Sequence, residues 1–110
     1  MTILVTGTSG FIGSNLIRYL IKSKKKFFGI DKIKNPYFNF KNFTKVDLQN
    51  KSRIEKIIKK KKITSVIHLA ATPGFVNCHN SPESAFKNNI EATFNLINSC
   101  KKNKIKKIII

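Results

Sequence analysis

The sequence predicts an α/β fold, a doubly wound parallel sheet with the strand order 3-2-1-4-5 and helices on both faces. Short apolar runs alternate with longer amphipathic segments, and the first apolar run leads directly into a glycine-rich turn. Because the chain has 110 residues and no visible repeat or linker, we expect one domain. Right-handed crossovers between parallel strands account for the predicted order.

The expected elements follow one another along the whole chain. We predict strands near 2–6, 27–31, 43–46, 65–69 and 107–110, and helices over 11–23, 51–61 and 82–102. Helical spacing assigns each helix an apolar face toward the sheet. The three expected faces are Ile12, Leu16, Ile17, Leu20 and Ile21 in the first helix, Ile54, Ile57 and Ile58 in the second, and Ile90, Phe94 and Ile97 in the third.

The most informative turn carries Gly7, Gly10 and Gly13 between the first strand and the first helix. Glycines at this spacing allow a tight turn, close approach of backbone to a ligand, and close packing of helix on strand. The free N–H groups of the turn and the positive end of the helix then face an anion such as a pyrophosphate. A strand-to-helix turn without a ligand is the structural alternative.

Asp31 ends the second apolar run, eighteen positions after Gly13. A carboxylate at this point can accept hydrogen bonds from both hydroxyls of an adenosine ribose and would repel the 2′-phosphate of NADP. Lys32 and Lys34 follow and would soften that discrimination. The alternative is a solvated aspartate in a turn. On spacing we predict NAD as the cofactor.

These segments together resemble the amino-terminal half of an extended short-chain dehydrogenase/reductase of the nucleotide-sugar epimerase and dehydratase type. The turn matches the TGxxGFIG pattern, Val46-Asp47-Leu48 resembles the adenine contact, and the segment from His68 to Ala71 resembles HLAA at the end of the fourth strand. Pro82, Phe86, Asn88, Asn89, Ala92, Thr93, Asn95 and Leu96 follow the pattern of the next helix.

The resemblance implies that residues 1–110 form an NAD-binding Rossmann domain without the catalytic and substrate-binding portions. It implies that the cofactor contacts Gly7, Gly10, Phe11, Ile12, Gly13, Asp31, Lys32, Asp47, Leu48, Leu69, Ala70, Ala71 and Asn88. Each later match also has a structural explanation, because small residues fit a crowded strand end and an asparagine fits a solvated helix face. His68 is interpreted as a structural histidine, since no second ligand stands at metal spacing.

The catalytic residues of this family are not expected in these 110 residues. Its members carry a Ser or Thr after the fifth strand and a Tyr-x-x-x-Lys on the next helix, where the tyrosine exchanges a proton with the sugar. Tyr37 and Lys41 are four apart, but they follow Pro36 in a predicted loop, where this spacing does not bring side chains together. We therefore expect no activity from this chain alone. A shortened gene, a split gene or a stand-alone nucleotide-binding module would each explain the sequence.

The net charge of +17 raises a rival function, binding of nucleic acid or another polyanion. The lysines concentrate at 22–26, 59–62 and 101–107, where the three helices end, and the helix dipole favours cations there. We expect this basic face to lie opposite the cofactor crevice. The abundance of Lys, Ile and Asn also fits A/T-rich codons, and no nucleic-acid-binding motif accompanies the charge. Nucleic acid is therefore not the predicted partner.

The remaining sequence features bear on the cellular location, the substrate and the self-association of the protein. Cys78 and Cys100 have neither metal nor redox spacing, so no metal is predicted and both thiols are expected to be reduced. No signal peptide or membrane span is visible, so a cytoplasmic location is expected. Residues 31–37 and 71–76 most resemble the UDP-glucuronate epimerases of this family, but Val76 stands where those enzymes carry an arginine. The nucleotide-sugar substrate therefore stays open, with UDP-galactose epimerases and sugar-nucleotide dehydratases as the alternatives. The last predicted strand would expose an apolar edge, which predicts self-association.

Overall fold

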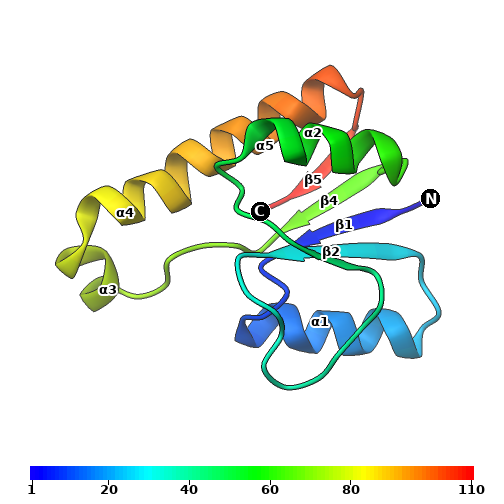
Figure 1. Cartoon of the computed structure of the whole chain (residues 1–110), viewed down its shortest axis with the longest axis horizontal. Helices are drawn as coiled ribbons and strands as arrows, with labels where there is room; N and C mark the ends of the chain where they lie inside the picture. The colour runs from blue at the N-terminus through cyan, green and yellow to red at the C-terminus, as the bar shows by residue number, and fades with distance from the viewer.

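A computed structural model describes all residues, 1–110, as a five-stranded parallel sheet in the order β3-β2-β1-β4-β5 (Figure 1). The predicted fold and strand order are confirmed. The strands are β1 (Ile3–Thr6), β2 (Phe27–Asp31), β3 (Phe43–Lys45), β4 (Ser65–His68) and β5 (Lys107–Ile109). The helices are α1 (Phe11–Lys22), α2 (Lys51–Lys60), α3 (Phe75–Asn80), α4 (Pro82–Phe86), the π-helical η1 (Lys87–Glu91) and α5 (Ala92–Lys102).

The central strand separates two apolar cores. Successive side chains of a strand point to opposite faces of the sheet, so Leu4 of β1 joins the larger core and Val5 the smaller one. Figure 1 shows α1 on one face of the sheet and α2 with α5 on the other. Ile17 and Leu20 of α1 fill the smaller core. Each fully buried side chain of this size stabilises the fold by about 1.5–3 kcal/mol.

The expected face of the first helix is only partly right. Ile17 and Leu20 are buried, but Ile12 and Ile21 are exposed to solvent. Gly13 and Ser14 take the place against the sheet that the apolar pattern assigned to Ile12. The close approach of Gly13 to the turn before the helix sets the rotation of α1, and hydrophobicity alone could not reveal this.

The expected face of the last helix is wrong. Ile90, Phe94 and Ile97 are exposed, whereas the residues against the sheet are Ala92, Leu96, Ser99 and Cys100. Both sets have helical spacing, but small residues allow the helix to lie close over the strands. The helix predicted as one element over 82–102 is also interrupted by the π-helical turn η1, which changes the phase of the side chains. In α2, by contrast, Ile54 and Ile58 are buried and Ile57 is partly buried, as predicted.

One helix was not predicted. The short α3 follows Gly74, which has a φ of +80°, and buries no side chain. It lies beyond the end of the sheet, between β4 and α4 (Figure 1). Without a buried face it leaves no hydrophobic periodicity in the sequence.

Three helix-to-strand turns share one geometry. Lys24, Lys62 and Lys104 have φ values of 51°, 52° and 56°, a left-handed conformation that usually belongs to glycine. In each turn the next residue's N–H bonds to a carbonyl five residues back, as in Ile63 to Ile58. The three turns lie at the same end of the sheet, where β2, β4 and β5 begin (Figure 1). We call this end of the sheet, with the lysines found within residues 22–26, 59–62 and 101–107, the basic edge.

Candidate functional site

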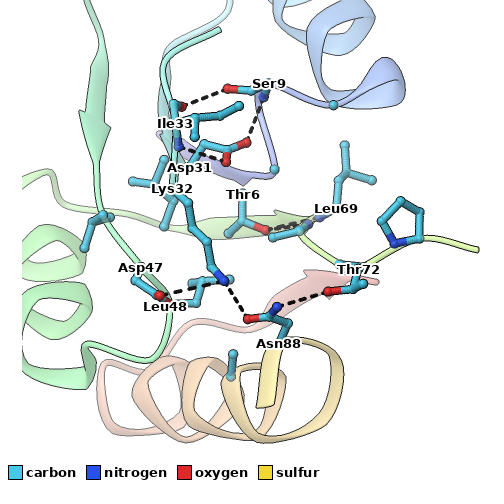
Figure 2. Close-up of a pocket in the computed structure, with 18 residues that line it drawn as sticks. Thr6, Ser9, Asp31, Lys32, Ile33, Asp47, Leu48, Leu69, Thr72 and Asn88 are labelled. Carbon is cyan, nitrogen blue, oxygen red and sulfur yellow. Dashed lines mark hydrogen bonds and ion pairs between the residues drawn. The ribbon is translucent and has the colours of Figure 1, made fainter. Parts of the chain in front are cut away.

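A crevice of about 410 Å³ opens at the carboxyl ends of the central strands (Figure 2). The basic edge lies at the other end of these strands. Topology dictates this place, because β1 lies between strands whose connections leave in opposite directions. Ten of the predicted site residues line it: Gly7, Gly10, Asp31, Lys32, Asp47, Leu48, Leu69, Ala70, Ala71 and Asn88. Five segments that are distant in the sequence thus meet around one cavity.

The three glycines have different tasks in this structure. Gly7 has a φ of +74°, and a Cβ on it would lie 2.6 Å from the backbone nitrogen of Ala70. A Cβ on Gly13 would overlap the carbonyl oxygen of Gly7. Gly10 has no neighbour closer than ordinary contact and lines the crevice. Gly7 and Gly13 therefore let the backbone pack tightly, and Gly10 leaves space on the side where a ligand would lie.

The amino-terminal end of α1 adjoins this space and is not capped by a side chain. Gly10 is the N-cap residue, no side chain caps the helix, and the first turn contains no acidic residue. The N–H groups at the start of a helix have no partner within the helix, and they carry the positive end of the helix dipole. This end of α1 therefore suits a phosphate group.

Asp31 is tied to the glycine turn. Its carboxylate accepts a hydrogen bond from the Ser9 N–H at 2.8 Å and a longer one from the Ile33 N–H at 3.4 Å. The Ser9 hydroxyl donates in turn to the Ile33 carbonyl at 2.9 Å. Figure 2 shows these bonds along one wall of the crevice. The carboxylate keeps lone pairs for two further hydroxyl donors, as a ribose would require.

A polar network joins the other walls. The Lys32 ammonium donates to the Asn88 side-chain oxygen at 2.6 Å and lies 3.7 Å from the Asp47 carboxylate. Asn88 donates from its amide nitrogen to the Thr72 hydroxyl at 3.0 Å. The end of β2, the segment after β3 and the π-helical turn η1 are thereby connected across the cavity (Figure 2).

His68 is a structural residue beneath the crevice. The Thr93 hydroxyl donates to the Asn89 carbonyl at 2.7 Å, so at 2.8 Å it must accept from the Nε2–H of His68. His68 Nδ1 then accepts from the Thr6 hydroxyl at 2.6 Å. These roles require the neutral imidazole, and burial lowers the pKa of His68 from its ordinary 6.5.

Thr6 extends this network to the crevice floor. Its hydroxyl oxygen accepts hydrogen bonds from the backbone N–H groups of Leu69 and Ala70, both at 3.2 Å. Thr6, Leu69 and Ala70 all line the crevice. The buried histidine thus holds the strand end whose small residues were predicted to lie against a cofactor.

Three predicted site residues lie outside the lining. Phe11 and Ile12 are 84% and 65% exposed, and Gly13 is buried between helix and turn. Only the backbone of these three residues, at the start of α1, is in a position to serve a ligand in the crevice. The prediction also missed eight lining residues: Thr6, Ser9, Ile30, Ile33, Val46, Thr72, Pro73 and Ala92. Most of them adjoin predicted residues in the chain, so extending each motif by a residue would have found them.

Tyr37 lies in a loop, 67% exposed, and is not among the residues that line the crevice. The buried Asn35 fixes this loop by donating to the Thr8 carbonyl at 2.9 Å and accepting from the Tyr37 N–H at 2.9 Å. The loop geometry leaves the Tyr37 and Lys41 pair without the helical spacing that would bring them together. The structure contains no group of three or more His, Cys, Asp or Glu residues able to hold a metal ion. None of its helices is both long and apolar enough to traverse a bilayer.

Comparison with known proteins decides the family. The model of the NAD dependent epimerase/dehydratase family matches residues 3–110. This chain belongs to that family. It is 30% identical over 118 residues to the bifunctional protein GAL10 of Candida maltosa, covering 96% of this chain and 77% of the relative. It is 39% identical over 120 residues to the dTDP-D-glucose 4,6-dehydratase of Dictyostelium discoideum, covering 97% of this chain but 27% of the relative.

Solved structures of the family have the same fold. The UDP-glucose 4-epimerase of Thermus thermophilus, crystallised with NAD, superposes with a TM-score of 0.86 at 27% identity. The match covers 98% of this chain and 36% of the epimerase. The chain thus spans about a third of this family member and corresponds to the amino-terminal portion of its relatives.

Proposed function

We propose that residues 1–110 bind NAD in the crevice as the cofactor-binding domain of a nucleotide-sugar epimerase or dehydratase. The observation that carries the proposal is the convergence of the glycine turn, the uncapped start of α1 and the Asp31 carboxylate on one cavity. Membership of an NAD-dependent family and the likeness to an epimerase crystallised with NAD support it.

Each wall of the crevice has a distinct proposed role. The N–H groups from Gly10 to Gly13 would hold the pyrophosphate, and Asp31 the hydroxyls of the adenosine ribose. Asp47 and Leu48 would contact the adenine, the former through its side chain and the latter through its backbone. The remaining predicted contacts, Leu69, Ala70, Ala71 and Asn88, would line the path toward the nicotinamide. The space beside Gly10 fits a cofactor backbone, since a side chain there would project into the cavity.

NAD supplies one capability when bound: its nicotinamide accepts a hydride from a sugar and can return it. This chain's residues bind and orient the cofactor, but none in the crevice is placed to move the sugar proton. The lining contains no tyrosine, and burial keeps His68 neutral and engaged on both ring nitrogens. We therefore propose that these 110 residues alone bind cofactor and do not turn over a nucleotide-sugar.

Substrate identity belongs to the same proposal. The relatives include UDP-glucose, UDP-glucuronate and dTDP-glucose enzymes, so a nucleoside diphosphate sugar is the substrate class we propose for the complete enzyme. Val76 in α3 cannot pair with a uronate carboxylate, which argues against UDP-glucuronate.

We also propose that the chain self-associates through the free edge of β5. This strand pairs only with β4, and Ile109 and Ile110 are exposed beside unpaired backbone groups. The basic edge, in contrast, is proposed to serve helix ends rather than nucleic acid, since its lysines cluster at the C-termini of three helices. Undetectable binding of duplex DNA at physiological salt would support that assignment.

Calorimetric titration with NAD tests the cofactor proposal directly. The Gly10→Val variant should abolish the heat of binding, because its side chain enters the crevice. Phe11→Val is the matched control, since this exposed side chain is outside the lining and its replacement should leave binding intact. Equal affinities for wild type and Gly10→Val would overturn the proposal.

A further inference from the structure

The basic edge carries most of the positive charge of the molecule. It holds thirteen of the chain's 22 lysines and arginines, four within 22–26, four within 59–62 and five within 101–107. All thirteen are lysines, and all are exposed. Only one of them pairs with a carboxylate, since Lys102 lies 3.3 Å from Glu55. In Figure 1, where the longest axis is horizontal, the three turns lie toward the right-hand end. One end of the molecule is therefore strongly cationic.

The acidic residues lie mostly away from the basic edge. Asp31 and Asp47 line the crevice. Glu83 in α4 and Glu91 in η1 lie at the start of the long helical segment whose end reaches the basic edge. Four of the five acidic residues are thus distant from the lysine clusters. An anionic surface would orient such a molecule with the basic edge toward it and the crevice away from it.

The helix ends account for only part of this charge. The helix dipole favours cations within the last turn of a helix. Five of the thirteen lysines occupy such turns: Lys22, Lys59, Lys60, Lys101 and Lys102. The other eight follow the helices, and within each cluster neighbouring lysines are closer than the Debye length of about 10 Å. Their mutual repulsion opposes the compact state, and an anionic partner would relieve it.

The three left-handed turn positions show a further preference for positive charge. Lys24, Lys62 and Lys104 have a positive φ that glycine or asparagine adopts with less strain. Asparagine also fits A/T-rich codons, so codon bias does not select lysine over it. A cation at all three positions, in spite of the strain, indicates that charge at the basic edge has a use of its own.

The make-up of the basic edge fits a lipid surface better than a nucleic acid. Arg18 and Arg53 both lie elsewhere, and arginine is the residue that pairs bidentately with single phosphates. The three helices present their C-terminal carbonyls there, and not the N–H groups that bind phosphate. Tyr19 and Ile21, near the end of α1, are 62% and 48% exposed. Lysines beside exposed aromatic and aliphatic side chains are typical of proteins that lie on anionic membranes.

We propose that the basic edge binds an anionic lipid surface. The lysines lie against the headgroups, and Tyr19 and Ile21 lie among them at shallow depth. The crevice, at the other end of the strands, stays open to solvent, so the membrane-bound protein binds a dinucleotide as the free protein does. This inference goes beyond the proposed function and does not depend on it, because no residue of the basic edge lines the crevice.

Flotation of the full chain with lipid vesicles tests the proposal, and it separates vesicle-bound protein from self-associated protein, which does not float. Wild type should float with vesicles of phosphatidylcholine and phosphatidylserine at physiological salt, and not with phosphatidylcholine alone. Salt at about 1 M should abolish binding, because the Debye length falls to about 3 Å. The triple variant Lys26→Gln, Lys60→Gln and Lys106→Gln removes one charge from each cluster. It should weaken binding about tenfold to hundredfold, since each lysine near the surface contributes about fivefold.

The matched control is the triple variant Lys45→Gln, Lys51→Gln and Lys87→Gln. These exposed lysines end β3, begin α2 and begin η1, away from the basic edge. The control has the same net charge as the first variant and should bind anionic vesicles as wild type does. Equal weakening in both variants would overturn the proposal, because net charge would then determine binding.

The remaining outcomes separate lipid binding from nucleic-acid binding and from the proposed function. Wild type that does not float with the anionic vesicles, or that binds duplex DNA more tightly than these vesicles at physiological salt, would overturn the proposal. An NAD affinity that is the same with and without vesicles supports the orientation, and a lower affinity on vesicles would overturn it. A chain that binds the vesicles but never NAD would overturn the proposed function alone.

Discussion

Turns between strands and helices form both ends of the sheet, but the two ends differ in their charged residues and in the residues that form the turns. At the crevice, Asp31, Asp47 and the start of α1 meet polar partners and a cavity. At the basic edge, three helices end in lysines, and Glu55 supplies the one acidic partner, 3.3 Å from Lys102. Glycine is used where backbones crowd at the crevice, whereas lysine adopts the left-handed conformation at the basic edge. A side chain at Gly7 or Gly13 would overlap neighbouring backbone atoms, so glycine is required there. The lysines at the basic edge adopt a strained backbone conformation that a side chain still allows.

The largest effect on stability should come from adding a side chain at a glycine where the neighbouring backbone leaves no room for one. Gly13→Ala places a Cβ over the Gly7 carbonyl oxygen, and we expect a loss of about 3 kcal/mol or more in the free energy of unfolding. Urea denaturation measures it. Gly74→Ala is the control: its φ is also positive, at +80°, but no atom lies near its Cβ, so only backbone strain should act, at a cost of about 1–3 kcal/mol. Equal losses in both variants would contradict the distinction between crowding and strain.

The buried histidine should make the crevice end sensitive to acid. The pKa of His68 is lowered in the folded state, so the unfolded chain binds the proton more readily. This contribution to stability is complete well above pH 6.5 and declines as the pH falls below it. Denaturation midpoints between pH 8 and pH 5 measure the decline.

His68→Gln tests whether His68 causes this dependence of stability on pH. Glutamine keeps a donor and an acceptor but does not titrate. The variant should cost about 1–3 kcal/mol, since one of the two threonine contacts is lost on a buried group. The variant should also make the free energy of unfolding less dependent on pH than it is in wild type. An unchanged slope would assign the acid sensitivity to other groups.

Replacing strained lysines should stabilise the basic edge slightly. Lys62→Gly, and equally Lys24→Gly or Lys104→Gly, relieves a left-handed conformation, and we expect a gain of a few tenths to about 1 kcal/mol. Lys56→Gly is the matched control, because the exposed Lys56 lies in the middle of α2 and glycine there costs about 1 kcal/mol. Thermal unfolding compares the two variants. Opposite signs for the two lysines would show that backbone conformation, not charge, determines the effect.

The smallest expected effect concerns the reactivity of the two cysteine thiols. Burial raises the pKa of Cys100 to about 11, although lysines surround the nearby end of α5. Cys78, in α3 at the crevice end, is only half buried. One thiol per folded chain should therefore react rapidly with a disulfide reagent at pH 8, and Cys78→Ser should abolish this rapid phase. Rapid reaction of Cys100 would mean that the nearby lysines favour its thiolate form more than burial disfavours it.

The comparison of elements explains which predictions succeeded. Strand positions followed from short apolar runs between turns, and the ribose-wall residue Asp31 followed from its distance to the glycine turn. The exposed Phe94 was misplaced because two stripes of α5 satisfy helical spacing, and only packing distance from the sheet selects Leu96. The helix α3 was missed because it buries nothing.

By itself the sequence determined the α/β fold, the strand order and the membership of a dinucleotide-binding family, because apolar periodicity and glycine spacing are local properties of the chain. Only the tertiary structure decided which side of α5 meets the sheet, how His68 holds the crevice floor, and that Lys32 reaches Asn88. These features depend on contacts between residues 25 to 62 positions apart. No local pattern encodes such distances, since they arise only when the strands have been brought side by side.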